Sequence, residues 1–314
     1  MLYVLRTYSM SIVMKLKKAV AKKITELNQP VITNYQLALA LHRLYRKKSI
    51  GREPIASITK EFASSRELSK IQNSMLDEGI LNHYRGLATK YVFSILGRKD
   101  AQPSEIACSV DPFCYVSHLS AMDYHGLTNR IPGKLFISSP GKNLWKEFAL
   151  ERMKKDLGED LDIYLSNGLP RLAKIKMEKI GKTVVHRQNS IHLGAYRNVQ
   201  KMTLRVSTVG RTFLDMLKAP DLCGGMAHVL EVFSEYAEKY QRLITDEVTS
   251  HGSQIDKVRA GYLLEELLGL DSPCFHDWVS YAQRGGSRKL DPSGEYLPEF
   301  SDKWKLSINV GNLG

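Results

Sequence analysis

Apolar side chains recur at intervals of three and four residues near the start of the chain. The recurring positions are Val13, Leu16, Val20, Ile24 and Leu27. This spacing places them on one face of a helix, and lysines occupy the other faces. The pattern therefore predicts an amphipathic helix over residues 11–27.

A second helical pattern follows the first after a proline. Thr33 or Asn34 can cap a helix that ends at about Lys47. The end of this helix is a basic run, residues 43–48. Residues 51–62 show no clear period, and we predict a short helix there.

The third helical pattern has a polar face of the kind that reads DNA. Ser64 and Glu67 have the spacing of a capping box, which predicts a helix from residue 64 to about residue 78. The inward positions of this helix are Leu68, Ile71, Met75 and Leu76. The opposite stripe is Arg66, Ser69, Lys70 and Asn73. Its cations can bind phosphates or guanine and its polar groups can bind bases, but any exposed helix face carries polar residues.

The segment after this helix predicts a β-hairpin. Gly79 can end the helix, residues 80–84 and 89–95 have the pattern of strands, and Arg85 and Gly86 form the turn. In a winged-helix domain three helices precede such a hairpin, the last helix lies in the major groove and the hairpin tip touches the backbone. We therefore predict a winged-helix domain that binds DNA. A winged helix that binds only protein is the alternative.

The excess positive charge lies in the same part of the chain. The formal net charge is +12; residues 1–99 hold 18 Lys and Arg against 6 Asp and Glu, whereas residues 100–314 hold 27 of each. Lysine and arginine side chains that neutralise phosphates release condensed counterions, so a cationic module suits a polyanion. A solubilising face or a membrane-surface patch would carry the same sign.

The remaining two hundred residues mix the two kinds of element. Helices are predicted at 115–127, 143–157, 211–217, 227–240 and 255–268, and strands at 134–138, 172–177, 183–186 and 202–207. Because strands come first and helices then take over, the fold class is α+β rather than a wound parallel sheet. A change of composition near residues 97–103 predicts two domains, a winged helix-turn-helix at 1–99 and a larger α+β domain with a helical C-terminal part at 100–314.

Four local patterns in this second part point to a known family. They are YVSHLSAMDYHGL at residues 115–127, STVGRTFLD at 207–215, Gly224-Gly225 after Pro220, and RAGYLLE at 259–265. With these patterns the sequence resembles the AbiEi-type antitoxins and related predicted regulators of viral defence systems. The second pattern is the most specific, because the family commonly shows a string of the form S-T-x-x-R-T-x-x-D. The resemblance implies an N-terminal domain that represses its own operon and a C-terminal domain that counters a nucleotidyltransferase toxin encoded beside it.

The residues of two patterns also have a structural interpretation. Arg211 and Asp215 stand four apart on one predicted helix and can pair, with Thr208 as the cap, so this string can act as a structural staple without chemistry. Gly224 and Gly225 suggest a tight turn rather than a phosphate cradle.

Patterns for catalysis are weak. A P-loop ending at Gly181-Lys182-Thr183 would need a glycine at position 176, which is a lysine. Ser117 and His118 are neighbours, and adjacent side chains diverge on a helix, so we do not expect them to face each other. We interpret His118, Asp123 and His125 as core or surface residues rather than as a catalytic set.

Patterns for metal binding are also weak. Glu159, Asp160 and Asp162 suggest a metal-dependent nuclease centre, but no acidic-x-Lys strand follows at a suitable spacing. The four cysteines have neither the spacing of a zinc site nor that of a disulfide framework. The apolar stretch at residues 2–14 is broken by Arg6 and is too short to cross a bilayer, so we predict a cytoplasmic protein without a membrane segment.

We therefore predict a DNA-binding repressor and antitoxin that is not an enzyme and needs no cofactor or metal. Its partners are double-stranded DNA at a promoter inverted repeat and a nucleotidyltransferase toxin, and a homodimer or two separate monomers would occupy the repeat. A DNA-directed nuclease docked by its winged helix, and an adaptor whose basic half binds an acidic protein, are the alternatives. The predicted DNA-binding residues are Lys22, Arg46, Lys47, Lys48, Ser65, Arg66, Ser69, Lys70, Asn73, Arg85 and Lys90.

Overall fold

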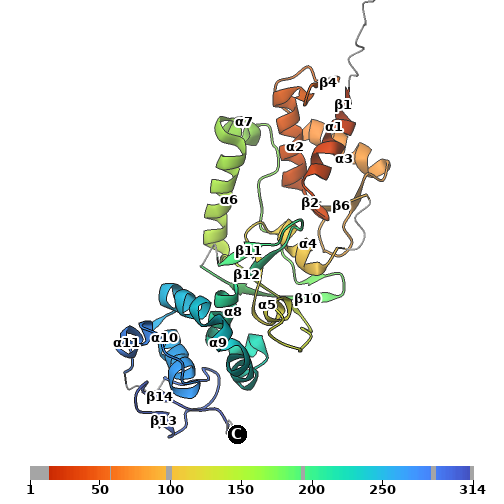
Figure 1. Ribbon diagram of the computed structural model, residues 1–314. Coiled ribbons are helices and arrows are strands. Elements are labelled where there is room, and N and C mark those ends of the chain that lie inside the picture. Colours follow the sequence, from red (N-terminus) through yellow and green to blue (C-terminus); the bar gives the residue numbers. More distant parts are fainter. Residues whose placement is uncertain (1–13, 57, 97–100, 192–194, 284–287, 312–314) are drawn as a thin grey trace, which may run out of the picture. The chain divides into compact units, whose positions relative to one another are not determined.

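The chain folds into two compact units, and neither is continuous in sequence. The computed structural model describes residues 14–56, 58–96, 101–191, 195–283 and 288–311 (Figure 1). The first unit consists of residues 1–112, 141–182 and 200–203, and the second of residues 113–140, 183–199 and 204–314. The fold class is α+β, as predicted. The predicted domains at 1–99 and 100–314 differ from these units, because residues 141–182 return to the first unit; the predicted junction at 97–100 lies outside the described residues.

The first unit combines helices with short strands. Its helices are α1 (Leu16–Glu26), α2 (Asn34–Lys47), α3 (Ser65–Asp77), α4 (Pro103–Val110), α6 (Lys142–Leu157), the 3-10 helix η1 (Gly158–Asp160) and α7 (Leu161–Ser166). Its strands are β1 (Met14–Lys15), β2 (Val31–Thr33), β3 (Ser49–Ile50), β4 (Glu53–Ala56), β5 (Leu81–His83), β6 (Val92–Ile95) and β9 (Lys179–Ile180). The predicted ends of α2 and α3 agree with these bounds to within one residue.

An antiparallel sheet in the order β2-β6-β5 lies beside these helices. Ile32 of β2 pairs with Phe93 of β6, and Asn82 of β5 pairs with Ser94 on the other side of β6. β2 runs directly into α2, where the Thr33 hydroxyl accepts the backbone N–H of Gln36 at 3.3 Å. The Gln36 side chain accepts the Thr33 N–H in return, which completes a capping box. The junction between strand and helix is therefore fixed on both sides.

The core of the first unit explains why α6 and α7 belong to it. Apolar side chains of α1, α2 and α3 pack in one cluster, and this cluster includes Met153 and Leu157 of α6 and Tyr164 of α7. The Tyr164 ring also meets the His42 imidazole of α2, with 5.4 Å between ring centroids. Helix α6 has an apolar face that must be buried, but the sequence of α6 alone does not indicate which helices pack against that face.

Two predictions for the first unit are wrong in part. Residues 14–15, expected in the first helix, pair instead with β4 as a parallel strand, so α1 begins at Leu16; residues 11–13 lie outside the described residues. A strand, β4, replaces the helix predicted at 51–62, because its edges pair with β1 and β3. These strands are two to four residues long, too short to give a periodic signal.

The second unit contains a mixed sheet and a group of helices. Its strands are β7 (Tyr115–Val116), β8 (Leu135–Ser139), β10 (Thr183–Asn189), β11 (Tyr196–Asn198), β12 (Arg205–Ser207), β13 (Phe300–Ser301) and β14 (Leu306–Ser307). Its helices are α5 (His118–Tyr124), α8 (Val209–Lys218), the 3-10 helix η2 (Pro220–Cys223), α9 (Met226–His251), α10 (Gln254–Gly261), the π-helix η3 (Tyr262–Leu267) and α11 (Cys274–Val279).

Parallel and antiparallel pairs alternate in the main sheet, whose order is β11-β12-β7-β8-β10. β10 pairs with β8 and β12 with β7 in parallel, whereas β7 with β8 and β11 with β12 are antiparallel. As predicted, the sheet is therefore not a wound parallel sheet. Two segments differ from the prediction: residues 115–116 form a strand rather than the start of a helix, and residues 172–177 form no strand.

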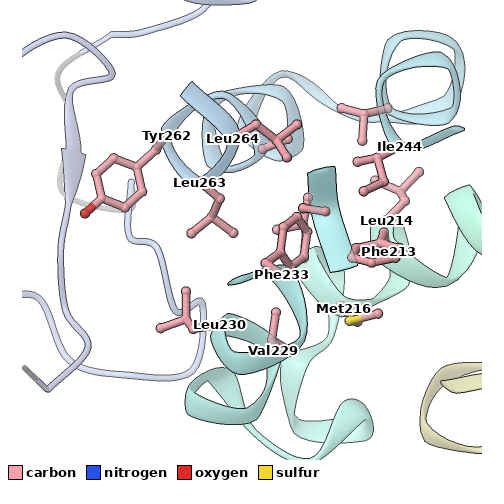
Figure 2. Packing of buried hydrophobic residues seen from close by; sticks show 14 of the residues in the cluster. Phe213, Leu214, Met216, Val229, Leu230, Phe233, Ile244, Tyr262, Leu263 and Leu264 are labelled. Atoms are coloured by element: carbon pink, nitrogen blue, oxygen red, sulfur yellow. The ribbon is translucent and has the colours of Figure 1, made fainter. Parts of the chain in front are cut away.

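Helices α8 and α9 build the core of the second unit. Figure 2 shows Phe213 and Leu214 of α8 close to Phe233 and Ile244 of α9. The rings of Phe213 and Phe233 meet edge to face with 4.9 Å between centroids. An aromatic pair in this geometry adds about 0.5–1.5 kcal/mol to the burial of its surface. The two helices are therefore held against each other over a dry interface.

Candidate nucleic-acid interface

The N-terminus of α3 is fixed by a capping box. The Glu67 carboxylate accepts the Ser64 backbone N–H at 3.0 Å and the Ser64 hydroxyl, and it also accepts the Lys60 ammonium at 2.7 Å. Hydrogen bonds from Lys60 first, and from Ser64 next, lower the pKa of Glu67 from 4.5 to about 2. The S-x-x-E prediction is thus confirmed, and the start of the helix is held rigidly.

We expect Glu67→Gln to destabilise the protein by about 1 kcal/mol at pH 7, because a charged cap binds the first-turn N–H groups more strongly than a neutral one. Because the pKa of Glu67 is lower in the folded protein, its contribution is present above about pH 4.5 and declines as the pH falls toward 2. Urea unfolding of the variant and the wild type at pH 7 and pH 3 measures this difference. The exposed Glu53→Gln is the control; an equal difference at both pH values would contradict the assignment.

The predicted stripe on α3 faces solvent. Leu68 and Met75 are buried and Ile71 and Leu76 pack against the core, as predicted. The polar stripe on the other side is exposed at all four positions, Arg66, Ser69, Lys70 and Asn73. The Ser69 hydroxyl bonds to the carbonyl of its own helix at Ser65, 3.0 Å away. Among the residues that the structure describes, the stripe side chains whose donors have no partner are therefore Arg66, Lys70 and Asn73.

The first turn of α3 touches the segment that follows α7. The Ser65 backbone N–H donates to the Asn167 carbonyl at 3.0 Å, so this amide is occupied and only the Ser65 side chain is exposed. At the other end of α3, the Lys17 ammonium of α1 lies 3.2 Å from the Ser74 hydroxyl and pairs with Glu78. We did not single out Lys17 from the sequence, whereas Lys22, which we did, is exposed on α1.

The predicted hairpin is present and turns at Arg85 and Gly86, but its second strand begins at Val92 rather than at residue 89. β5 and β6 are joined by residues 84–91, which contain the predicted contacts Arg85 and Lys90, both exposed. The Tyr84 N–H donates to the Val92 carbonyl at 2.9 Å and continues the ladder into the turn. The two cations therefore lie on residues 84–91, the connection whose two ends are held by the pairing of β5 with β6.

The basic run at the end of α2 divides into engaged and free cations. The Arg46 guanidinium pairs with Glu61, lies 2.9 Å from the Asp160 carboxylate and stacks 4.7 Å from the Phe62 ring centroid. It is therefore occupied within the unit and is a weaker candidate for phosphate than the sequence suggests. Lys47 and Lys48 are exposed, and Lys48 ends the helix in the left-handed region at φ 54°.

The charge follows the compact unit rather than the predicted boundary. By the bounds given above, the first unit holds 29 Lys and Arg against 16 Asp and Glu, and the second holds 16 against 17. The segment 141–182 adds ten cations to the first unit. One unit therefore remains strongly basic and the other remains close to neutral, even though the boundary has moved.

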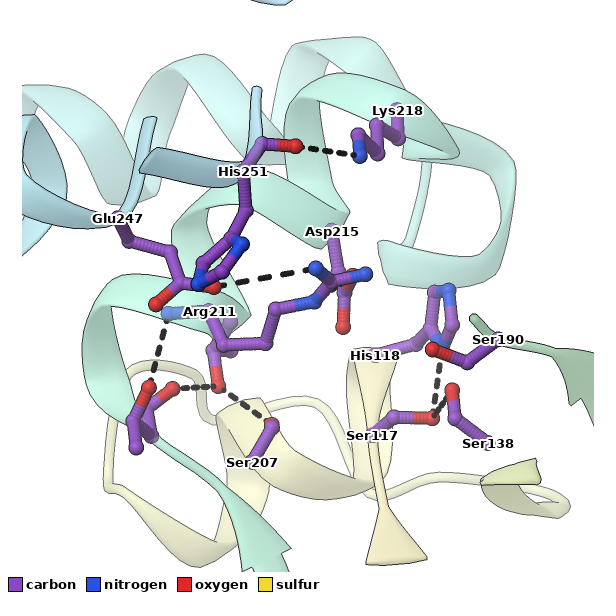
Figure 3. Close-up of polar contacts among 12 residues, drawn as sticks. Ser117, His118, Ser138, Ser190, Ser207, Arg211, Asp215, Lys218, Glu247 and His251 are labelled. Atoms are coloured by element: carbon purple, nitrogen blue, oxygen red, sulfur yellow. Dashed lines mark hydrogen bonds and ion pairs between the residues drawn. The ribbon is translucent and has the colours of Figure 1, made fainter. Parts of the chain in front are cut away.

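The signature string of the second unit forms an internal ion pair. The Arg211 Nε lies 2.9 Å from Asp215 Oδ1, and both side chains are less than 10% exposed. Figure 3 shows Glu247 of α9 facing the same guanidinium, with 3.8 Å between Arg211 Nη1 and Glu247 Oε1. The Thr208 hydroxyl accepts the Arg211 N–H at 3.2 Å. The predicted structural staple is confirmed in its geometry.

The prediction that Ser117 and His118 do not face each other is wrong. His118 Nδ1 lies 2.8 Å from the Ser117 hydroxyl, which also accepts the Ser138 hydroxyl at 2.9 Å (Figure 3). Ser117 is extended and His118 has a φ of 52°, so the two residues are not successive helical positions. Burial lowers the pKa of His118, which favours the neutral ring. The hydrogen bonds that run from His118 through Ser117 to Ser138 join α5 to β8 inside the unit.

Two other residues that the sequence suggests for chemistry, Asp160 and His125, have structural contacts. Asp160 is bound by His42 and Arg46, and His125 Nε2 lies 2.7 Å from the Ser207 carbonyl. Gly224 and Gly225 have φ of 95° and 90°, which confirms the predicted turn.

No group of three or more His, Cys, Asp or Glu in the described ranges is arranged to hold a metal ion. Within the same ranges, no helix has both the length and the apolar character that a bilayer crossing requires.

Comparison with known proteins finds likeness only among solved structures. No protein-family model matches the sequence, and no curated protein matches it. Among solved structures, the chain is similar to the RV2827C protein from Mycobacterium tuberculosis, with 12% sequence identity, a TM-score of 0.43, and coverage of 93% of this chain and 90% of that one. Function is therefore inferred from the residues described above.

Proposed function

We propose that the first unit is a winged-helix domain that binds duplex DNA, and that the protein represses transcription. Support comes from the element order α1-β2-α2-β3-β4-α3-β5-β6, in which β3 and β4 lie between the second and third helices, together with the sheet order β2-β6-β5. A winged helix has three helices, a strand between the first two, and a hairpin that joins this strand in a sheet. In this proposal α3 enters the major groove, and the connection between β5 and β6 lies along the flanking backbone.

The exposed stripe of α3 carries the proposal. Arg66 and Asn73 are of the types that bond base edges, since guanidinium pairs with guanine and a carboxamide with adenine. Lys70, between them, is of the type that neutralises a phosphate. These side chains are exposed on a helix whose start is fixed by the Glu67 cap, so the helix can be inserted without rearrangement.

The second unit is proposed to act as the antitoxin part, which counters a nucleotidyltransferase encoded beside this gene. The resemblance of residues 207–215 to the AbiEi-type string supports this assignment, and the near-neutral charge of the unit suits a protein partner better than a polyanion. Expression of the neighbouring nucleotidyltransferase with and without this chain tests it. Growth arrest that this chain does not relieve would rule out the antitoxin role.

Fluorescence anisotropy with the duplex upstream of the gene tests the DNA-binding proposal. Saturable binding that exceeds binding to a scrambled duplex by about a thousandfold or more is expected for a specific regulator. Affinity should fall steeply with salt, because each neutralised phosphate releases counterions. Equal affinity for both duplexes would reject sequence-specific repression, and cleavage of the duplex in Mg²⁺ would favour the nuclease alternative.

Variants of α3 should separate base contacts from phosphate contacts. Arg66→Ala and Asn73→Ala are expected to cost about 1–3 kcal/mol with the promoter duplex and little with the scrambled one. Lys70→Ala should weaken both duplexes alike and lower the salt slope by about one. Arg242→Ala on α9 of the second unit, exposed at 93%, is the control. Unchanged binding in the three α3 variants would show that this face is not the interface.

A further inference from the structure

The first unit contains a cavity that neither α3 nor the connection between β5 and β6 lines, although Lys47, predicted from the sequence to bind DNA, lies at it. Its volume is about 560 Å³, and α1, α2, α4 and α6 contribute to its walls. Sites for small ligands occupy about 300–1,000 Å³ and combine apolar walls with a few fixed polar groups. Leu27, Ala40 and Leu172, which are exposed or partly exposed, give this cavity such apolar walls. Its size and lining are therefore those of a small-molecule site.

Two guanidinium groups in this cavity are held by one carboxylate. Arg152 donates from Nε to Asp156 Oδ2 at 3.0 Å, and Arg43 donates from Nη2 to the Asp156 carbonyl at 3.2 Å. The Tyr35 hydroxyl also donates to Asp156 Oδ2, at 3.1 Å. These contacts orient both arginines, but in the described part of the chain they leave Nη1 and Nη2 of Arg152 and Nε and Nη1 of Arg43 without a partner.

Positively charged side chains outnumber negatively charged ones in the lining of the cavity. Two guanidinium groups face the single Asp156 carboxylate, and the nearby Lys47 of the same cavity has no ion pair within the described ranges. Lys23 is neutralised by Glu26, 2.6 Å away. An anion can supply the missing negative charge, and the planar, bidentate donors of arginine match a phosphate group.

Two amide side chains of the same cavity, Gln29 and Gln36, offer hydrogen bonds to a neutral group. Gln36 Nε2 donates to Gln29 Oε1 at 2.8 Å, which leaves one hydrogen on Gln36 and the Gln29 amide nitrogen open to the cavity. We propose that this cavity binds a small organic phosphate of the size of a nucleoside monophosphate. Its phosphate lies on Arg43 and Arg152, its base lies against the apolar wall of the cavity, and the two amides bond to its polar edge.

A small ligand fits this site better than DNA does. The guanidinium groups lie in a cavity among four helices, and each is about half exposed, whereas phosphates of a duplex are met by side chains that project from a convex face. The site goes beyond the proposed repressor function and does not rest on it. Binding of such a ligand to α2, which precedes α3, would give the protein an effector site.

Isothermal titration of the full-length chain with the four ribonucleoside monophosphates tests the proposal. At least one is expected to bind at one site per chain, with a dissociation constant of roughly 10–100 µM. The corresponding nucleoside, which lacks the phosphate, should bind at least tenfold more weakly. If none of the four monophosphates binds at about 1 mM, the proposal is wrong.

Two substitutions locate the site. Arg152→Met keeps the alkyl chain and leaves Tyr35 and Arg43 on Asp156, so the fold should persist while affinity for the monophosphate falls about tenfold. Lys47→Met, at a side chain with no ion pair within the described ranges, should weaken binding severalfold without a change in melting temperature. Arg242→Met in the second unit is the control and should bind like the wild type.

DNA titrations of the same variants keep the two proposals distinct. If Arg152→Met weakens promoter binding in the absence of any monophosphate, and no monophosphate binds to the wild type, the arginines serve DNA phosphates and the small-ligand site is refuted. If the monophosphate binds but promoter DNA does not, the cavity stands and the repressor proposal fails.

Discussion

Gly210→Ala is expected to destabilise the second unit by about 3 kcal/mol. A Cβ atom at this position in α8 would lie 2.1 Å from the Leu243 carbonyl oxygen of α9, and 3.1 Å from the Glu247 Cβ. The first contact is with backbone, so no side-chain rotation can relieve it. The two helices would have to separate, which would open the packing between Phe213 and Phe233. Overpacking of a dense core costs about 1–3 kcal/mol and occasionally more.

Chemical denaturation followed by circular dichroism measures this effect. Gly133→Ala in the same unit is the matched control, because no atom lies within 4 Å of the position of its added Cβ. The control is expected to change the free energy of unfolding by less than about 0.5 kcal/mol. A Gly210→Ala protein as stable as its control would mean that α8 and α9 do not approach as closely as described.

Asp215→Ala is expected to cost about 3–5 kcal/mol, because it leaves the Arg211 guanidinium buried without its nearest carboxylate. Arg211 is 5% exposed and Asp215 is 3% exposed, so water does not replace the lost partner. Glu247, 3.8 Å from Arg211 Nη1, is too distant to take over the hydrogen bond to Nε.

A surface pair in the same unit provides the control. Arg242 and Asp246 on α9 have the same i,i+4 spacing, with 3.7 Å between their charged atoms, but they are 93% and 68% exposed. Asp246→Ala should therefore cost less than about 0.5 kcal/mol. The double variant Arg211→Met with Asp215→Leu should recover part of the loss from Asp215→Ala, since it removes the buried guanidinium, while Glu247 loses the cation that faces it. Equal losses for Asp215→Ala and Asp246→Ala would contradict a structural role for the signature string.

The helices of the first hundred residues could be predicted because their signals are local. Thr33 caps α2 and Ser64 caps α3, and in both the carboxamide or carboxylate three residues later completes the box. The apolar period then defines the buried face without reference to the rest of the chain. By contrast, β1 and β4 exist because Met14 pairs with Ile55, a contact between segments forty residues apart that no local pattern reports.

The candidate interface was only partly accessible from the sequence for a similar reason. Exposure of the α3 stripe follows from the helical period, and it was predicted. The engagement of Arg46 with Asp160 depends on where α6 and α7 pack, and this is a tertiary contact. The contacts of Arg43 and Arg152 with Asp156 depend on the same packing of α6. Arg43 and Asp156 are more than a hundred positions apart in the sequence.

The assembly of the first unit from separate segments affects how the protein is made. Its core requires Met153, Leu157 and Tyr164, which leave the ribosome long after α1, α2 and α3 have been synthesised. Until then the nascent chain exposes the apolar surface that these residues later cover, and domains with such distant contacts fold slowly and are vulnerable to aggregation. The first unit, most of which is translated first, can thus complete its core only after more than half of the chain has been translated.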